Sequence, residues 1–153
     1  MNVKRRYHMR KKTGVFIFVL VLGALVWLTA CSLLQDKILS GTDQDAVLAF
    51  SEAVTDNMLA GLEANDYVVF SRDFDTDMQK NLPATDFAAW KQDLDNKFGN
   101  YLSRNVDRVS QSQEFYVVDY QARFEKDEQV FIVVAFHASD HTISNVWFDA
   151  DKP

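Results

Sequence analysis

The apolar residues of this chain change their spacing once, close to Tyr101, and that change limits the folds open to it. Before Tyr101 they recur every three or four residues, which predicts helices that bury one face. After Tyr101 they alternate with polar residues, which predicts strands. Helices followed by consecutive strands indicate an α+β domain with the helices on one face of an antiparallel sheet.

Two stripes carry the helical spacing: Val47, Phe50, Val54, Met58 and Leu62, and then Phe87, Trp90, Leu94 and Phe98. Three helices are predicted, over residues 44–65 with a short continuation at 67–70, over 73–82 and over 84–98. Thr42 or Asp43 is expected to cap the first helix, and Gly99 to end the last one.

Four strands are predicted, over residues 104–113, 115–124, 129–137 and 142–149. In the second of them, one face carries Tyr116, Val118, Tyr120, Ala122 and Phe124, and the other carries polar residues such as Asp119. The third is apolar on both faces, as expected of a central strand that is covered on both sides.

Charge separates the chain into two parts. The first 30 residues hold six basic residues and no acidic one, whereas residues 31–153 hold 10 basic and 22 acidic residues, a net charge of −12. That negative body excludes a nucleic-acid-binding surface, which needs a cationic face. The single cysteine, Cys31, excludes a disulfide framework and a zinc site built from cysteines.

The first 30 residues have the pattern of a secretory signal. A basic segment precedes 14 uncharged residues, Val15 to Leu28, which is shorter than the roughly 20 residues of a membrane-spanning helix. The segment then ends in Leu28, Thr29 and Ala30, directly before Cys31. An uncleaved N-terminal anchor is the alternative interpretation of this segment.

Leu28-Thr29-Ala30-Cys31 resembles the lipobox of bacterial lipoproteins. The resemblance implies cleavage between Ala30 and Cys31 and lipid attachment to the Cys31 thiol. Two or more acyl chains hold a protein stably on a membrane, whereas one gives marginal binding. The expected organisation is a signal peptide over residues 1–30, a lipidated cysteine and tether over 31–42, and one domain over 43–150 on the extracytoplasmic side of the cell membrane.

A second resemblance covers most of residues 43–149. Residues 57–82 (NMLAGLEANDYVVFSRDFDTDMQKNL) are similar to the opening of nuclear transport factor 2-like, or ketosteroid isomerase-like, domains. The matching positions are Gly61, Leu62, Asp66, Tyr67, Phe70, Phe74 and Met78, with Trp147 and Phe148 resembling the last strand. The same residues are also similar to those of a family of short bacterial lipoproteins of unknown function. The resemblance implies three helices on a curved four-stranded antiparallel sheet, a cone-shaped, cystatin-like fold with a pocket between helices and sheet. It implies no activity, because one fold carries many functions.

Two functions stay open at this point. One is a non-catalytic domain that binds a small apolar ligand or a protein partner at the cell surface, with Tyr67, Tyr116, Tyr120 and Trp147 as candidate pocket residues. The alternative is a ketosteroid isomerase-like enzyme acting on a small hydrophobic substrate, for which Asp119 and His137 are the candidate catalytic residues.

No metal or other cofactor is predicted. His137 and His141 have the i, i+4 spacing of a helical metal site, but they flank a predicted turn between strands. Asp73, Asp75 and Asp77 alternate as in a calcium loop. However, Met78 and Ala84 stand where such a loop needs glycine and glutamate, so an acidic helix start is the preferred interpretation.

The sheet face away from Tyr116 is expected to be apolar. Its predicted members are Phe115, Val117, Phe131, Val133, Ala135, Val146 and Phe148. An exposed surface of this kind predicts a homodimer or a partner protein of the cell envelope. The alternative is that residues 32–40 or the end of the chain cover it.

Overall fold

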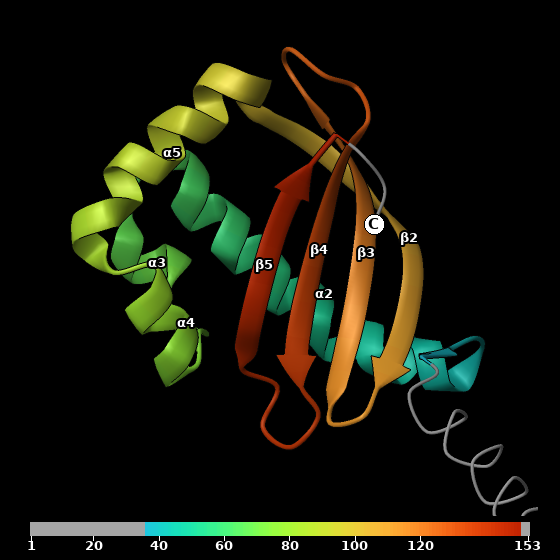
Figure 1. Ribbon diagram of the computed structural model, residues 1–153. Helices are drawn as coiled ribbons and strands as arrows, with labels where there is room; N and C mark the ends of the chain where they lie inside the picture. Colours follow the sequence, from blue (N-terminus) through green and yellow to red (C-terminus); the bar gives the residue numbers. More distant parts are fainter. Residues whose placement is uncertain (1–35, 151–153) are drawn as a thin grey trace, which may run out of the picture. The chain divides into compact units, whose positions relative to one another are not determined.

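The α+β class is confirmed by the computed structural model, which describes residues 36–150. In chain order, its elements are β1 (Lys37–Ile38), α2 (Thr42–Glu63), α3 (Tyr67–Phe70), α4 (Thr76–Asn81), α5 (Ala84–Phe98), β2 (Tyr101–Ser112), β3 (Phe115–Phe124), β4 (Val130–His137) and β5 (Ile143–Asp149). Figure 1 shows α2 crossing one face of the sheet, with α3, α4 and α5 gathered beside β5.

The sheet has five antiparallel strands in the order β1-β2-β3-β4-β5, so the prediction of four strands was wrong. The additional strand comes from residues assigned to the tether. Lys37 lies opposite Gln111 and Ile38 opposite Ser110, and the Leu39 N–H donates to the Val109 carbonyl at 2.8 Å. Part of the expected tether therefore belongs to the folded domain.

The number of helices also differs from the three predicted, because residues 67–70 form a separate helix. Asn65 adopts a positive φ of 53° and redirects the chain after α2. The Asp66 side chain then accepts the N–H groups of Val68 and Val69, which caps α3. The described part of the chain consequently has four helices.

Glycine sets two of the helix boundaries. Gly41, with a φ of 57°, is the N-cap residue of α2. Thr42 and Asp43 lie inside the helix, so the prediction that one of them caps it was wrong. Gly99 ends α5 with φ 78°, in agreement with the prediction. Both φ values lie where residues with a side chain are strained.

The α2 and α3 helices approach each other at Gly61. A Cβ atom on this residue would lie 2.2 Å from the backbone nitrogen of Phe70. The absence of a side chain therefore allows α3 to pack directly on α2 and directs Phe70 into the interior, where its side chain is 1% exposed.

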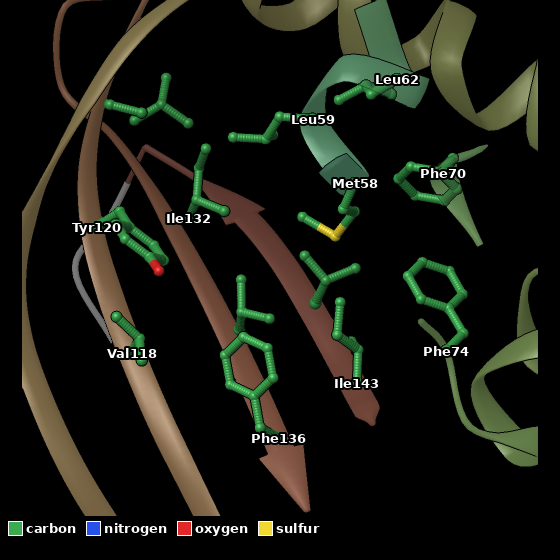
Figure 2. Close-up of a cluster of buried hydrophobic side chains, with 14 of the residues drawn as sticks. Met58, Leu59, Leu62, Phe70, Phe74, Val118, Tyr120, Ile132, Phe136 and Ile143 are labelled. Carbon is green, nitrogen blue, oxygen red and sulfur yellow. The ribbon is translucent and has the colours of Figure 1, made fainter. Parts of the chain in front are cut away.

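The main core lies between the helices and the sheet. In Figure 2, Met58, Leu59 and Leu62 of α2 point toward the sheet, and Phe70 and Phe74 lie beside them. The facing side chains of the sheet are buried: Val118, Tyr120, Ile132, Phe136 and Ile143. These apolar side chains fill the layer in which the ketosteroid isomerase-like alternative would place a substrate pocket.

The sheet face turned away from α2, called the outer sheet face below, differs from the predicted one. Phe115, Val117, Phe131, Val133 and Ala135 share this face, but Val146 and Phe148 lie opposite Val134 and Ile132 and turn toward the helices. A register shift in β5, opposite Ala135 and Phe136, changes the alternation after Ile143. It places Asn145 and the half-exposed Trp147 on the outer sheet face instead.

None of the helices in this described part is both long and apolar enough to span a lipid bilayer. The predicted signal peptide, with Leu28, Thr29, Ala30 and the lipid-attachment residue Cys31, lies outside the described residues.

Candidate functional site

A groove of about 410 Å³ opens at the N-terminal end of α2. It is lined by Leu39, Asp43, Ala46, Val47, Phe50, Gln111, Tyr116 and His141. Its volume is in the range of small-molecule sites. Its walls combine apolar and aromatic side chains with the polar residues Asp43, Gln111 and His141. This groove, called the α2 groove below, is the candidate binding site.

Four separate segments build the α2 groove. Leu39 follows β1, and Val47 and Phe50 lie one turn apart on α2. Tyr116 and Gln111 are directly opposite each other on β3 and β2, so their side chains share the sheet face that α2 covers. His141 comes from the turn between β4 and β5.

Aromatic stacking joins two of these segments. The Phe50 and His141 rings lie parallel, with centroids 3.7 Å apart and an angle of 3° between their planes. His141 has a φ of 63°, which is uncommon for a residue other than glycine, and its N–H donates to the His137 carbonyl at 2.9 Å. The stack fixes one wall of the groove while leaving the imidazole edge exposed to a ligand.

The four predicted pocket residues do not converge on one site. Tyr116 lines the α2 groove, whereas the Tyr67 hydroxyl donates to the Leu82 carbonyl at 2.9 Å. Tyr120 is fully buried in the core, and Trp147 lies on the outer sheet face. Alternation within one strand placed Tyr116 and Tyr120 on the correct face, but it did not separate the groove from the core.

Tyr120 belongs to a polar cluster beneath α2. Its hydroxyl is 3.2 Å from Oγ1 of Thr55, and its ring lies 4.6 Å from the Arg104 guanidinium. Burial raises the pKa of Tyr120 to about 12, although the Thr55 hydrogen bond opposes this shift. A phenol in this setting stays protonated and serves as a hydrogen-bonding group of the core.

Arg104 connects β2 to α2 in the same cluster. Its Nη1 donates to Oδ1 of Asp56 at 2.7 Å, and its Nη2 donates to Oε2 of Glu52 at 3.1 Å. Burial lowers the pKa of Arg104, but the acidic groups of Tyr120, Glu52 and Asp56 raise it by more. Glu52 and Asp56 are four residues apart on one helix face, which lets both carboxylates reach a single guanidinium.

Asp119 lies on the outer sheet face, away from the α2 groove. It is 2% exposed, and its Oδ2 accepts from Nε of Arg108 at 2.6 Å. Its Oδ1 has no hydrogen-bond partner within residues 36–150. The carboxylate is therefore held by the cation directly opposite it on β2.

His137 is at the end of β4 and contacts a different carboxylate. Its Nε2 is 2.9 Å from Oδ2 of Asp75. Asp119 lies opposite Val133, four residues before His137, so about 13 Å of strand separates the two candidate catalytic residues. The structure does not bring them together.

Asp75 also caps α4, because its Oδ1 accepts from the Met78 N–H at 2.6 Å. Burial raises the pKa of Asp75, but the Met78 N–H and His137 lower it by more, and the pKa is below its ordinary value. Asp75 and Asp77 therefore lie at the start of α4, which begins at Thr76 and not at residue 73 as predicted, whereas Asp73 precedes the helix and accepts from Asn57 and Arg72. Within the described residues, no three side chains of histidine, cysteine, aspartate or glutamate are close enough to hold a metal ion.

Most residues of the α2 groove were not predicted as site residues. Phe50 and Val47 were assigned to a helix stripe, and Leu39 to the tether. Tyr116 alone was named as a pocket residue. Predicting this groove required knowing that residues 37–38 pair with β2. Two residues form too short a pattern to indicate such a strand.

Comparisons with family models, with curated proteins and with solved structures found no significant match to this chain.

Proposed function

We propose that this protein is a bacterial lipoprotein whose single domain binds a small apolar ligand, without catalysis, on the extracytoplasmic side of the cell membrane. The observation that carries the binding function is the α2 groove, with Leu39, Val47, Phe50 and Tyr116 on its apolar wall. The sequence Leu28-Thr29-Ala30-Cys31 supports the anchor, and a lipid on Cys31 would fasten the domain through its N-terminus.

The short connection limits how far the α2 groove can lie from the proposed anchor at Cys31. Leu39 is only eight residues after Cys31, which an extended chain spans in at most about 28 Å. The net charge of −12 on residues 31–153 disfavours contact with anionic lipid headgroups, so the acyl chains hold the domain while its surface stays in water.

Substitution of the anchoring residue tests the localisation. We expect Cys31→Ser to retain its leader and to lack the acyl mass that mass spectrometry finds on the membrane-extracted wild type. An intact Met1 on the wild-type protein, or normal cleavage and membrane retention of the variant, contradicts the anchor.

A large side chain at the mouth of the groove tests the binding function. Ala46 lines the groove and is exposed, so Ala46→Arg is expected to block it without disturbing the core. Ala53→Arg, at another exposed alanine of α2, is the matched control. Mass spectrometry of the lipid extract should find an apolar compound with the wild type and the control but not with Ala46→Arg; equal amounts in all three contradict the proposal.

The enzyme is the alternative function. An enzyme needs an ionisable group that faces the bound substrate. Two observations favour the binding function instead: apolar side chains fill the layer between helices and sheet, and Asp119 and His137 lie far apart.

The nuclear transport factor 2-like fold is part of the same proposal. Helices that precede the long strands and pack on one sheet face support it, as does the close approach of α2 and α3 at Gly61, within the segment that carries the resemblance. The short strand β1 and the separate helix α3 are features that the resemblance did not imply.

The proposed partner is a second copy of the chain, which binds through the outer sheet face. Phe115, Val117, Phe131 and Trp147 are partly or half exposed there, and Ile38 of β1, 67% exposed, extends the same face. A symmetric dimer would remove this apolar surface from water.

A further inference from the structure

Within residues 36–150, the edge of β5 away from β4 forms backbone hydrogen bonds to another segment at its start. There the Asp75 N–H donates to the Ile143 carbonyl at 2.9 Å, and the Ile143 N–H donates to the Asp73 carbonyl at 2.7 Å. Phe74 and Ile143 thereby form a parallel bridge, as if a sixth strand were starting. The chain then leaves the sheet, because Asp75 caps α4.

The rest of this edge is open for backbone pairing. The Val146 N–H donates to Oδ1 of Asn145 at 2.9 Å, so it points away from β4. Alternate residues of a strand direct their backbone groups to the same side, which places the N–H and C=O of Phe148 on the open edge too. Within residues 36–150, the backbone bonds that this edge makes to other segments are the two at Ile143. The Val146 N–H is thus bonded to a side chain, whereas the Val146 carbonyl and the backbone groups of Phe148 make no backbone bond to other segments within residues 36–150. Backbone groups of this kind at a sheet edge are a template for another strand.

A second groove lies beside this edge at Asn145 and Val146. It has a volume of about 200 Å³ and is lined by Met78, Asn81 and Leu82 at α4, Trp90 of α5, and Asn145 and Val146 of β5. Figure 1 shows α4 and α5 standing beside β5, so the groove has a strand on one side and helices on the other. This β5 groove therefore combines backbone hydrogen-bonding groups, an apolar floor and two carboxamides.

We propose that the β5 groove binds an extended peptide segment of another protein, which adds to β5 as a sixth strand. Backbone hydrogen bonds to the Val146 carbonyl and to Phe148 would hold the segment, and one apolar side chain would enter the space between Met78, Leu82 and Trp90. Asn81 and Asn145 can bond to the peptide backbone on either side of that pocket.

Charge and space define the occupant further. The domain's net charge of −12 favours a basic segment. A second copy would bring its own α4 and α5 to the same edge, whereas a single extended strand needs only about 5 Å beside β5. This inference is independent of the anchor and of the α2 groove.

Hydrogen exchange of the full-length protein in detergent tests it. The probe is a blocked octapeptide that alternates valine and lysine around a central leucine, and its matched control carries N-methyl groups on alternate backbone nitrogens. At a peptide concentration ten times the Kd, the Phe148 amide should exchange about tenfold more slowly. The N-methylated peptide should have no effect, and neither peptide should slow exchange at β1, on the opposite edge.

Two variants separate groove binding from general attraction of a basic peptide. Asn81→Lys places a positive charge on the groove and should weaken binding about fivefold. Gln92→Lys, at an exposed position of α5 outside the groove lining, should leave the affinity unchanged. Unchanged exchange at Phe148 with millimolar peptide, equal binding of the N-methylated peptide, or equal weakening by the two variants overturns the proposal. Protection of Phe148 that rises with protein concentration alone identifies a second copy as the occupant and overturns it as well.

Discussion

At the scale of single residues, burial changes the acid–base behaviour of Tyr120. Its hydroxyl lies in the core beside Thr55, and its pKa is raised to about 12. In the unfolded chain the same phenol has a pKa near 10. The folded protein therefore keeps a proton on Tyr120 over a pH range in which the unfolded chain loses it.

We expect this difference to lower stability at alkaline pH. Below pH 10, both states hold the proton and Tyr120 adds no pH dependence; above it, the unfolded state is favoured until the folded phenol ionises near pH 12. The free energy of unfolding should fall by about 2–3 kcal/mol over this range from Tyr120 alone. Urea unfolding at several pH values measures it, and Tyr120→Phe should show a shallower fall. Identical slopes for the two proteins contradict the assignment.

At the scale of elements, the packing of α3 on α2 depends on Gly61. Two effects of Gly61→Ala oppose each other. Alanine favours a helix interior over glycine by about 1 kcal/mol, which would stabilise the protein. The new Cβ, however, would lie 2.2 Å from the Phe70 nitrogen and 2.6 Å from its Cα, and backbone cannot rotate away as a flexible side chain can.

We therefore expect Gly61→Ala to destabilise the protein, by about 2–3 kcal/mol, because overpacking of a tight contact costs more than helix propensity returns. The midpoint of urea unfolding should fall. Ala60→Gly, at the neighbouring exposed position, is the matched control and should cost only about 1 kcal/mol. An increase in stability for Gly61→Ala would show that α3 moves away freely from α2.

At the scale of the whole molecule, the outer sheet face determines the expected state of association. Trp147 is 50% exposed on the edge strand β5, at one end of a row that also holds Val133, Asp119 and Arg108. Arg108, which pairs with the buried Asp119, gives this face a partly exposed charged side chain.

Sedimentation of the purified protein at micromolar concentration should show a dimer, and Trp147→Lys should make it a monomer with unchanged stability. Burial of a lysine charge in an apolar interface is unfavourable, so the effect is expected on association alone. Val68→Lys is the control, because Val68 is 77% exposed on α3 and is not on the sheet. A wild type that is monomeric at every concentration removes the dimer from the proposal.

Sequence periodicity located the elements well where the pattern was long. The alternation over residues 115–124 gave the bounds of β3 and its buried face, and the stripe from Phe87 to Phe98 gave α5. It failed where the pattern was short or irregular. Two residues are too few to show an alternating pattern, so the strand β1 was not predicted. The register shift in β5 placed Val146 and Trp147 on the sheet faces opposite to those that strict alternation predicts.

The candidate site was predictable only in part, since its residues come from distant segments. Tyr116 was identified as a pocket residue, yet Leu39, Phe50 and His141 reach it from positions up to 102 residues apart. Asp119 and His137 were named as candidate catalytic residues, but each bonds to a partner that no local pattern indicates.

The order of helices and strands and the leader pattern depend on residues that are neighbours in the chain, and the net negative charge depends on composition. The sequence alone therefore determined these expectations. The pairing of Lys37 and Ile38 with β2, the Tyr120–Arg104 cluster under α2 and the two grooves were decided by tertiary structure. Each of these depends on contacts between residues far apart in the chain, and such contacts form only when the helices pack on the sheet.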